Sequence, residues 1–217
     1  MSRRPRLRTD VRRLPVKQVR ERAVLDALLD AAFVAHVAIL DEAGQPAVVP
    51  LAMARDGDTL LVHGSTASRA FRYLATGAAT CVAVTIVDGV VVARSQFESS
   101  LQYRSAMIFG TFAPLTGAPK AKGLQVLAAH LLPGLDGPRT PTEPELKATS
   151  LLTMAIEEWS VKVSARPPQD KPEDVDRASW AGVVPLQHGF GTPVDAPDLG
   201  PGLTVPEAIG SWPSGRA

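Results

Sequence analysis

Short runs of apolar residues separated by turn-forming residues occupy most of the first 165 positions. Runs rich in valine, isoleucine and threonine, bounded by Gly, Pro, Asn or Asp, are typical of β-strands. Asp88-Gly89 lies between two such runs and predicts a hairpin turn, as does the segment 41–45. The pattern predicts strands over residues 33–40, 46–54, 59–63, 79–87, 90–97, 103–114 and 151–165.

Helical periodicity appears between these runs. The spacing of apolar residues predicts an amphipathic helix from Lys17 to about Ala32, and further helices over 65–74 and 120–132. Pro141-Thr142-Glu143-Pro144-Glu145-Leu146-Lys147 predicts a short capped helix with proline near its start. There is no repeated strand–helix alternation, and no Walker or dinucleotide-binding glycine motif. The pattern therefore predicts an α+β, mainly β fold, a closed or split barrel of about six antiparallel strands, and argues against a Rossmann fold.

Composition divides the chain further. Residues 1–13 form a basic arm that we expect to be flexible, residues 14–166 the barrel domain, and residues 167–217 a Pro/Gly-rich extension that wraps around it. The net charge of +1 gives no strong field for nucleic acid, although basic residues gather in the first 22 positions. We expect no nucleic-acid partner and no membrane partner, with nucleic-acid binding through this arm as an alternative.

Cysteine and histidine usage restricts the chemistry. The lone Cys81 excludes an intrachain disulfide, favours a reducing compartment, and is expected in a buried strand. The four histidines are far apart in sequence and show no metal-ligand spacing, so we expect no metal site of that kind. No signal-peptide pattern follows the basic start, and the longest apolar run, 31–40, is too short to span a bilayer. We therefore expect a cytoplasmic protein.

The segment from Leu60 to Arg69 is the first candidate for ligand binding. An apolar strand ends in His63-Gly64 and passes into a helix headed by Ser65, Thr66 and Ser68. Backbone N–H groups, hydroxyls and Arg69 at such a junction suit a phosphate. Because such caps and surface arginines are also common without a ligand, the structural interpretation remains open at this point.

A second stretch, from Asp88 to Gly110, adds motifs that occur together in a known family. The matching pieces are, in chain order, His63-Gly64 before Ser68-Arg69, Asp88-Gly89 leading to Ala93-Arg94-Ser95, Tyr103-Arg104-Ser105 before Gly110, Pro141-Thr142-Glu143 with Glu145-Leu146-Lys147-Ala148-Thr149, Val161-Lys162-Val163 before Pro167-Pro168, and Trp180-Ala181-Gly182-Val183-Val184-Pro185-Leu186. From about Leu14 to Leu186 the chain resembles the FMN-binding split-barrel flavoproteins of the pyridoxamine 5'-phosphate oxidase superfamily, with the nitroimidazole-reductase-like branch the most similar.

The resemblance implies a split β-barrel that forms a homodimer and holds two FMN molecules at the subunit interface. Side chains fill a small barrel, so a ring as large as isoalloxazine needs a groove that a partner closes. The cofactor-binding residues that the resemblance implies are Val49, Pro50, Leu51, His63, Gly64 and Ser65 around the ring, Ser68 and Arg69 at the phosphate, and Tyr103, Arg104 and Ser105 as further contacts.

The function implied is a flavin-dependent oxidoreductase in which a nicotinamide or deazaflavin donor reduces the flavin, and a small electrophilic acceptor is reduced in turn. Members of the branch usually carry a His-Ser-Met-Asn type segment where this chain has Ser99-Ser100-Leu101-Gln102, so an imidazole near the flavin is lost. No acid–base pair is evident, and we assign no catalytic residue. A non-catalytic flavin- or haem-binding protein for storage, sensing or stress protection is the alternative. Pyridoxamine 5'-phosphate oxidation is a further one, although we locate no pocket for a second phosphate.

Overall fold

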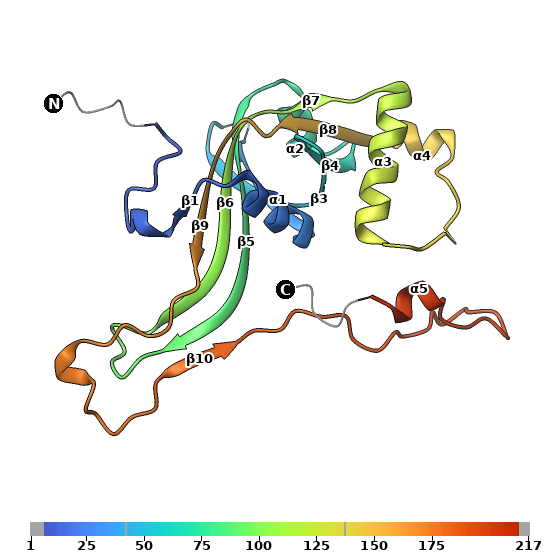
Figure 1. The fold of residues 1–217 in the computed structure, drawn as a ribbon. Helices are drawn as coiled ribbons and strands as arrows, with labels where there is room; N and C mark the ends of the chain where they lie inside the picture. The colour runs from blue at the N-terminus through green and yellow to red at the C-terminus, as the bar shows by residue number, and fades with distance from the viewer. Residues whose placement is uncertain (1–6, 42, 137, 213–217) are drawn as a thin grey trace.

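The computed structural model describes residues 7–41, 43–136 and 138–212. The strands form one antiparallel sheet in the order β1-β9-β6-β5-β2-β3-β4-β8-β7, and β10 pairs with β5 off this path (Figure 1). The strands predicted over 33–40, 46–54, 59–63 and 103–114 are present, the last divided into β6 and β7, and the structure adds the short strands β1 and β10. The strands are β1 (Gln18–Val19), β2 (Val34–Leu40), β3 (Pro46–Asp56), β4 (Thr59–Ser65), β5 (Ala79–Val92), β6 (Ser100–Thr111), β7 (Ala113–Pro114), β8 (Thr149–Ala155), β9 (Glu158–Ser164) and β10 (Gly182–Pro185).

The sheet rolls up because of one short connection. β8 and β9 lie near opposite ends of the strand order, yet only Ile156 and Glu157 separate them in the chain. The two ends of the sheet must therefore approach each other, while no ladder joins β8 to β9 in the described residues. The result is a barrel that is split along this seam, which confirms the predicted mainly β class.

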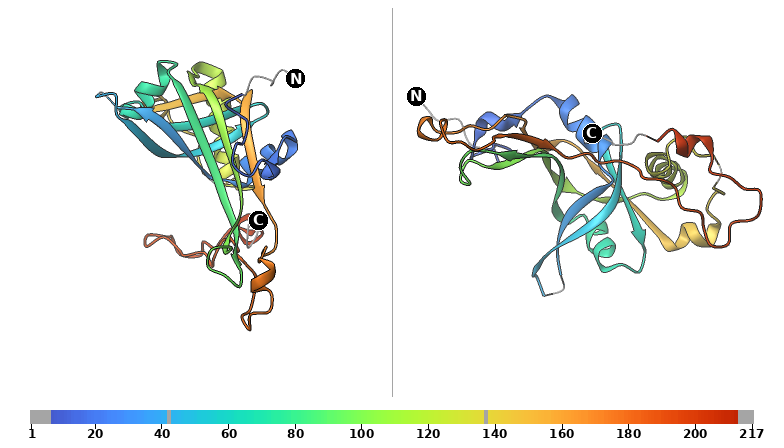
Figure 2. Two further views of the ribbon diagram at one scale, coloured as in Figure 1. Left: turned by 90° about the vertical axis from the view of Figure 1, so that its left-hand side faces the viewer. Right: turned by 90° about the horizontal axis from the view of Figure 1, so that it is seen from below.

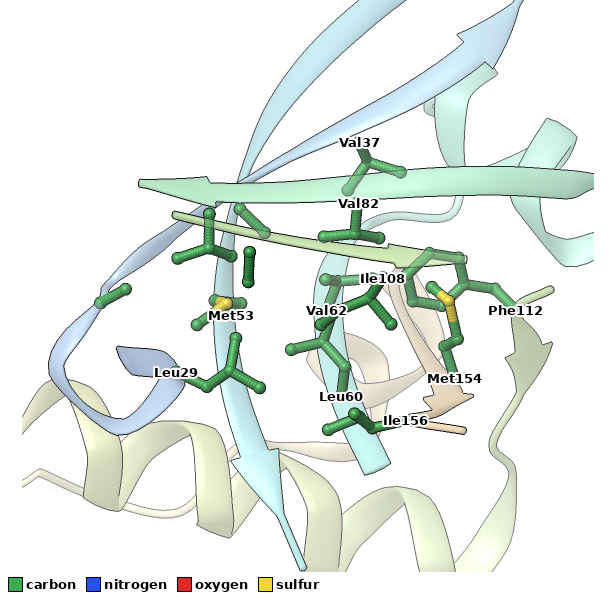
Figure 3. Packing of buried hydrophobic residues seen from close by; sticks show 14 of the residues in the cluster. Leu29, Val37, Met53, Leu60, Val62, Val82, Ile108, Phe112, Met154 and Ile156 are labelled. Carbon is green, nitrogen blue, oxygen red and sulfur yellow. The ribbon is translucent and has the colours of Figure 1, made fainter. Parts of the chain in front are cut away.

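The barrel interior holds the main hydrophobic core (Figure 3). Met53, Val62 and Ile108 point into it from three strands and have no solvent exposure. Helix α1 (Arg22–Ala31) closes one opening with Leu25, Leu28 and Leu29, which are also fully buried. Their i, i+3, i+4 spacing is the apolar stripe that predicted this helix.

Two strand predictions are wrong in an informative way. Asp88-Gly89 is not a hairpin turn, because β5 continues through it to Val92 with a register shift between Val87 and Gly89. The hairpin lies later, between β5 and β6. The predicted strand 151–165 is two strands, β8 and β9, which bend apart at Ile156, a residue buried in the core. The buried positions of β5 are Thr80, Val82 and Val84 before the bulge and Gly89 and Val91 after it, so each half alternates by itself and resembles a separate strand.

The helices are close to their predicted positions. Helix α2 (Arg69–Ala75) is shorter than predicted because β4 runs on to Ser65, and α1 is shorter because Pro15–Lys17 form a 3-10 turn followed by β1. Helix α3 (Gly117–Leu131) covers a second, smaller cluster around Leu61 and Leu151. Helix α4 (Glu143–Ala148) has the predicted cap, a complete capping box. Within the described ranges, no helix has the length and apolar character needed to cross a bilayer.

The structure describes the predicted basic arm and the C-terminal extension only in part. Part of the predicted basic arm, residues 1–6, falls outside the described residues. After β10 the C-terminal segment crosses beneath the barrel and ends near α3, with a short helix α5 (Glu207–Gly210) close to its end (Figures 1 and 2). Cys81 lies in β5, as predicted; it is partly buried, and burial raises the pKa of its thiol.

Candidate functional site

Among the described residues, no strand lies beside one stretch of the β5 edge. On this edge β2 pairs with Val82 and Ala83, and β10 pairs with Gly89 to Val92. The residues between these two ladders form the floor of a pocket of about 620 Å³, which we call the edge pocket. Its lining residues are Ala31, Ala32, Phe33, Val34, His36, Thr85, Ile86, Val87, Gln187, His188, Gly189 and Phe190.

Two histidines from distant parts of the chain line this mainly apolar pocket. His36 comes from β2 and is exposed, and its imidazole makes no hydrogen bond to any described residue. His188 follows β10, and its Nε2 lies 3.0 Å from the Val87 carbonyl oxygen. A carbonyl only accepts, so Nε2 carries the proton and, in a neutral ring, the Nδ1 lone pair is free. Two imidazoles with available nitrogens above apolar walls are a donor set suited to the metal of a planar cofactor.

A second hollow, which we call the α2 groove, contains three of the predicted cofactor residues. Val49, Ser68 and Arg69 line a pocket of about 610 Å³ together with Arg72 and Tyr73. The Arg69 guanidinium is exposed and has no hydrogen bond or ion pair within the described ranges. Arg72 donates from Nη1 to the Ala67 carbonyl at 2.8 Å. The groove therefore offers an unpaired cation beside a hydroxyl, the groups that a phosphate needs.

The helix dipole contributes little to this groove. Helix α2 has only seven residues, and its N-cap Ser68 makes no side-chain capping bond. A macrodipole sums aligned peptide units, so a helix of two turns supplies a weak one. The sequence argument from a helix N-terminus is thus the weaker part of that prediction, and the side chains of Arg69 and Ser68 are the stronger part.

The His63-Gly64-Ser65 segment at the end of β4 has a packing role. A Cβ added at Gly64 would lie 2.3 Å from Cε2 of Phe71, so glycine is required here by a buried ring on α2. His63 is different: its Nδ1 is buried and lacks a hydrogen-bond partner in the part of the chain that the structure describes. A buried nitrogen without a partner is unfavourable and suits contact with a bound group.

The Tyr103-Arg104-Ser105 block lies on β6, the strand next to the part of β5 that lines the edge pocket. On β6 these residues pair with Val87, Ile86 and Thr85, the β5 residues that line the pocket. The Arg104 guanidinium is already engaged with Asp88, Nη2 to Oδ1 at 2.7 Å. The Lys17 ammonium lies 5.5 Å from the centroid of the Tyr103 ring. Arg104 is thus less available to an anion than Arg69.

Strand register divides the predicted residues between the two faces of the sheet. Pro50 lies opposite His36 across the β2–β3 ladder, and directly opposed side chains share a face. His36 also pairs with Ala83 on β5, and Ala83 pairs with Met107 on β6. Ser105 and Tyr103 are two and four residues before Met107, so their side chains lie on the same face. Val49, Leu51 and Arg104 lie on the other face. The structure therefore does not gather the predicted residues into one cavity of a single chain.

The sequence patterns did not identify His36 and His188 as a pair. Their spacing follows no local ligand rule, and only the pairing of β10 with β5 brings His188 to the pocket. The one available signal is a histidine in an apolar strand together with a histidine in an otherwise proline-rich tail. Among the described residues, no group of three or more His, Cys, Asp or Glu side chains gathers as a metal site.

Comparison with known proteins agrees with the fold. The profile described as pyridoxamine 5'-phosphate oxidase matches residues 21–163. The FAD and heme binding protein from Mycobacterium smegmatis is 43% identical, with a TM-score of 0.88, and the match covers 92% of this chain and 98% of that one. The flavocytochrome Anf3 from Azotobacter vinelandii is 34% identical, with a TM-score of 0.88, and the match covers 96% and 97% of the two chains.

A more distant structure shares the fold alone. It is named for 5-nitroimidazole antibiotic resistance and comes from Bacteroides thetaiotaomicron, with 18% identity, a TM-score of 0.57, and coverage of 67% of this chain and 86% of that one. No curated protein matches the chain. The family match spans well over half of the sequence, and the resemblance carried by the short motifs is confirmed. The chain belongs to the pyridoxamine 5'-phosphate oxidase family.

Proposed function

We propose that this protein is an oxidoreductase that binds a flavin in the α2 groove and a haem in the edge pocket. The observation that carries the proposal is the presence of His36 and His188 in one apolar pocket on the open edge of β5. Two relatives above 30% identity, described as FAD- and haem-binding and as a flavocytochrome, support the same pair of cofactors. Sequence analysis gave haem binding only as part of the alternative function, and the two histidines of the edge pocket make it part of the main proposal.

The edge pocket fits a haem in size and donor chemistry. Its volume of about 620 Å³ lies within the range of cofactor pockets, and its walls include Phe33, Ile86 and Phe190. Histidine is a common haem ligand, and a free imidazole nitrogen is its requirement. In this proposal His36 and His188 hold the iron, while the apolar side chains exclude water from the ring.

The α2 groove fits the phosphate of a flavin. Arg69 neutralises the phosphate, Ser68 donates a hydroxyl, and Val49 supports the ring. The resemblance implied FMN, whereas the Mycobacterium smegmatis relative is described as FAD-binding, so we propose FAD as the first form to test. A bound flavin supplies electron transfer to and from small substrates and metal centres. This chain's own contribution is to bind and orient the cofactors, because the described residues offer no evident acid–base pair.

We also propose that a second copy covers the outer face of β2 and β3. Val34, Leu40, Val48 and, on β6, Met107 are 44%, 46%, 62% and 45% exposed on this face. Apolar residues gathered on one face of a sheet favour an interface. Light scattering should give a dimer mass for the wild type, and V48K should shift it towards the monomer. A wild-type monomer at micromolar concentration would contradict the homodimer.

Hemin titration tests the edge pocket. We expect a Soret band in the wild type, and about tenfold weaker binding, ~1.4 kcal/mol, in H36A and in H188A, because each variant loses one donor to iron. K147A is the control, since Lys147 lies on α4, pairs with Glu143 and is not among the lining residues. Binding of hemin by H36A and H188A at wild-type affinity would contradict the assignment.

Flavin retention tests the α2 groove separately. R69A should release FAD and FMN about tenfold more readily, because it removes the free cation, whereas R177A, a surface arginine paired with Asp174, should not. Oxidation of a nicotinamide or a reduced deazaflavin by the loaded protein then tests turnover. Cofactors retained without any steady-state rate would favour the storage or sensing alternative.

A further inference from the structure

One wall of the edge pocket is not part of the barrel. Residues 187–190 lie in the C-terminal segment, while the other lining residues belong to the β2 and β5 region. We call residues 186–212 the C-terminal strap. It passes beneath the barrel in the view of Figure 1 and in the left view of Figure 2. Its last described residue bonds to Pro133 at the end of α3. A wall supplied by a separate segment opens the pocket whenever that segment leaves.

The strap is held firmly where it begins. β10 pairs Gly182–Pro185 with β5, and the amide of Leu186 donates to the Asp88 carbonyl at 2.9 Å. Next along the chain, His188 donates to Val87 as described above. The Leu186 bond continues the backbone ladder of β10, and the His188 bond adds a side-chain contact on the open edge of β5. They fix the start of the wall but leave its far end to other contacts.

The far end is held by Trp212. Its indole Nε1 donates to the Pro133 carbonyl at 2.8 Å, at the end of α3. Its ring lies 4.9 Å from the Phe190 ring, and Phe190 in turn lies 6.1 Å from Phe33 in an edge-on contact. A chain of aromatic contacts thus runs from Trp212 through the strap to the barrel wall of the pocket.

Between these two anchors the strap has little hold on the barrel. Within the described ranges, the backbone hydrogen bonds of residues 191–206 stay inside the strap, from Leu199 to Ala196 and from Leu203 to Gly200. Val194 and Leu203 are 92% and 63% exposed. Segments with few buried contacts open at low free-energy cost. Loss of the Trp212 anchor therefore removes one of the ring contacts that hold Phe190 in the pocket wall.

We propose that Trp212 is a positioning residue that keeps the strap in its closed position, seated as one wall of the edge pocket, so that a planar ligand such as haem leaves faster when the strap is released at Trp212. The identity of the ligand rests on the proposed function, whereas the closing role of Trp212 rests on its own contacts. Trp212 acts through Phe190 and His188 and does not itself line the pocket.

Proteolysis of the cofactor-free protein tests the closing role without any ligand. Chymotrypsin should cut after Phe190 about tenfold faster in W212A than in the wild type, because an aromatic pair and a hydrogen bond are lost. W212F keeps a ring and loses the bond to Pro133, so its rate should be intermediate. Cleavage after Phe97, which is 86% exposed and lies outside the strap, is the internal reference and should not change. V194A is the matched control and should be cut after Phe190 at the wild-type rate. Wild-type cleavage at Phe190 in W212A would overturn the proposal.

Hemin release completes the test. Transfer of hemin to apomyoglobin should be about tenfold faster from W212A than from the wild type or V194A, with the thermal midpoint of the barrel unchanged. A wild type that takes up no hemin would remove the proposed haem function and leave the proteolysis result to decide the closing role. Faster cleavage with unchanged hemin release would overturn control of ligand exit by Trp212.

Discussion

The substitution G64A distinguishes two roles of Gly64, which are close packing against the Phe71 ring and the contact with the cofactor that the resemblance implied. A Cβ at this position would lie 2.3, 2.8 and 2.8 Å from Cε2, Cδ2 and Cζ of the Phe71 ring. Phe71 is 3% exposed and belongs to the main core, so its ring has no free direction in which to move. Overpacking a core of this kind costs about 1–3 kcal/mol.

Urea denaturation of the cofactor-free protein measures the effect. We expect G64A to lower the free energy of unfolding by ~2 kcal/mol, which for a chain of this size lowers the thermal midpoint by roughly 4–8 °C. G191A is the matched control, because a Cβ there has no heavy atom within 4 Å and the backbone is not left-handed. It should change the midpoint by less than about 1 °C.

A double variant tests the cause. F71L removes the ring that the new Cβ would meet, so G64A in that background should cost ~1 kcal/mol less than G64A alone. If G64A matches the wild type in stability and instead releases the flavin, the packing argument is refuted. Gly64 would then be a residue where the ligand approaches the backbone.

Three other outcomes follow from ion pairs and a helix cap. D170A should lower the free energy of unfolding by about 3 kcal/mol in urea titrations. The Asp170 carboxylate is 4% exposed, and it pairs with the Arg94 side chain at 2.8 Å and accepts a hydrogen bond from the Arg94 amide at 2.6 Å. An effect below ~1 kcal/mol would contradict a buried pair. Arg139 holds the pKa of Glu145 at about 2, so the carboxyl signal of Glu145 in NMR should titrate near pH 2, and R139A should move it towards 4.5. Since the folded pKa is the lower one, this pair stabilises the fold above pH 4.5 and loses its effect as the pH falls from 4.5 to 2; a wild-type signal that titrates near 4.5 would exclude the pair. T142A removes the capping box of α4 and should cost ~1 kcal/mol by urea denaturation, whereas T142S should not.

Local patterns predicted the elements whose determinants are local. The cap of α4 was visible as Thr142 followed three residues later by Glu145, and the apolar stripe of α1 was visible as a helical repeat. The Asp88-Gly89 dipeptide was misleading, because a glycine that serves a turn also serves a bulge. Here a Cβ at Gly89 would lie 2.9 Å from the Val184 carbonyl oxygen, so the glycine admits β10, a partner that lies far away in sequence.

The candidate site was predictable only in part for the same reason. Ser68, Arg69 and Val49 were identified through motifs, and the structure brings them to one groove. Arg104 was identified in the same way, yet Asp88 already neutralises it across the β5–β6 ladder. His36 and His188 carry no motif at all, because the edge pocket exists only where one ladder on β5 ends and another begins.

In the proposed function this chain binds a haem and a flavin in separate sites. The absorption spectrum of the purified protein after reconstitution with hemin and FAD, followed by identification of the flavin released on heating, tests both sites together. We expect a Soret band together with the flavin bands, with the Soret band weakened in H36A and H188A and the flavin bands weakened in R69A. A protein that fails to bind hemin, or fails to bind flavin, after reconstitution would contradict the proposal of two sites.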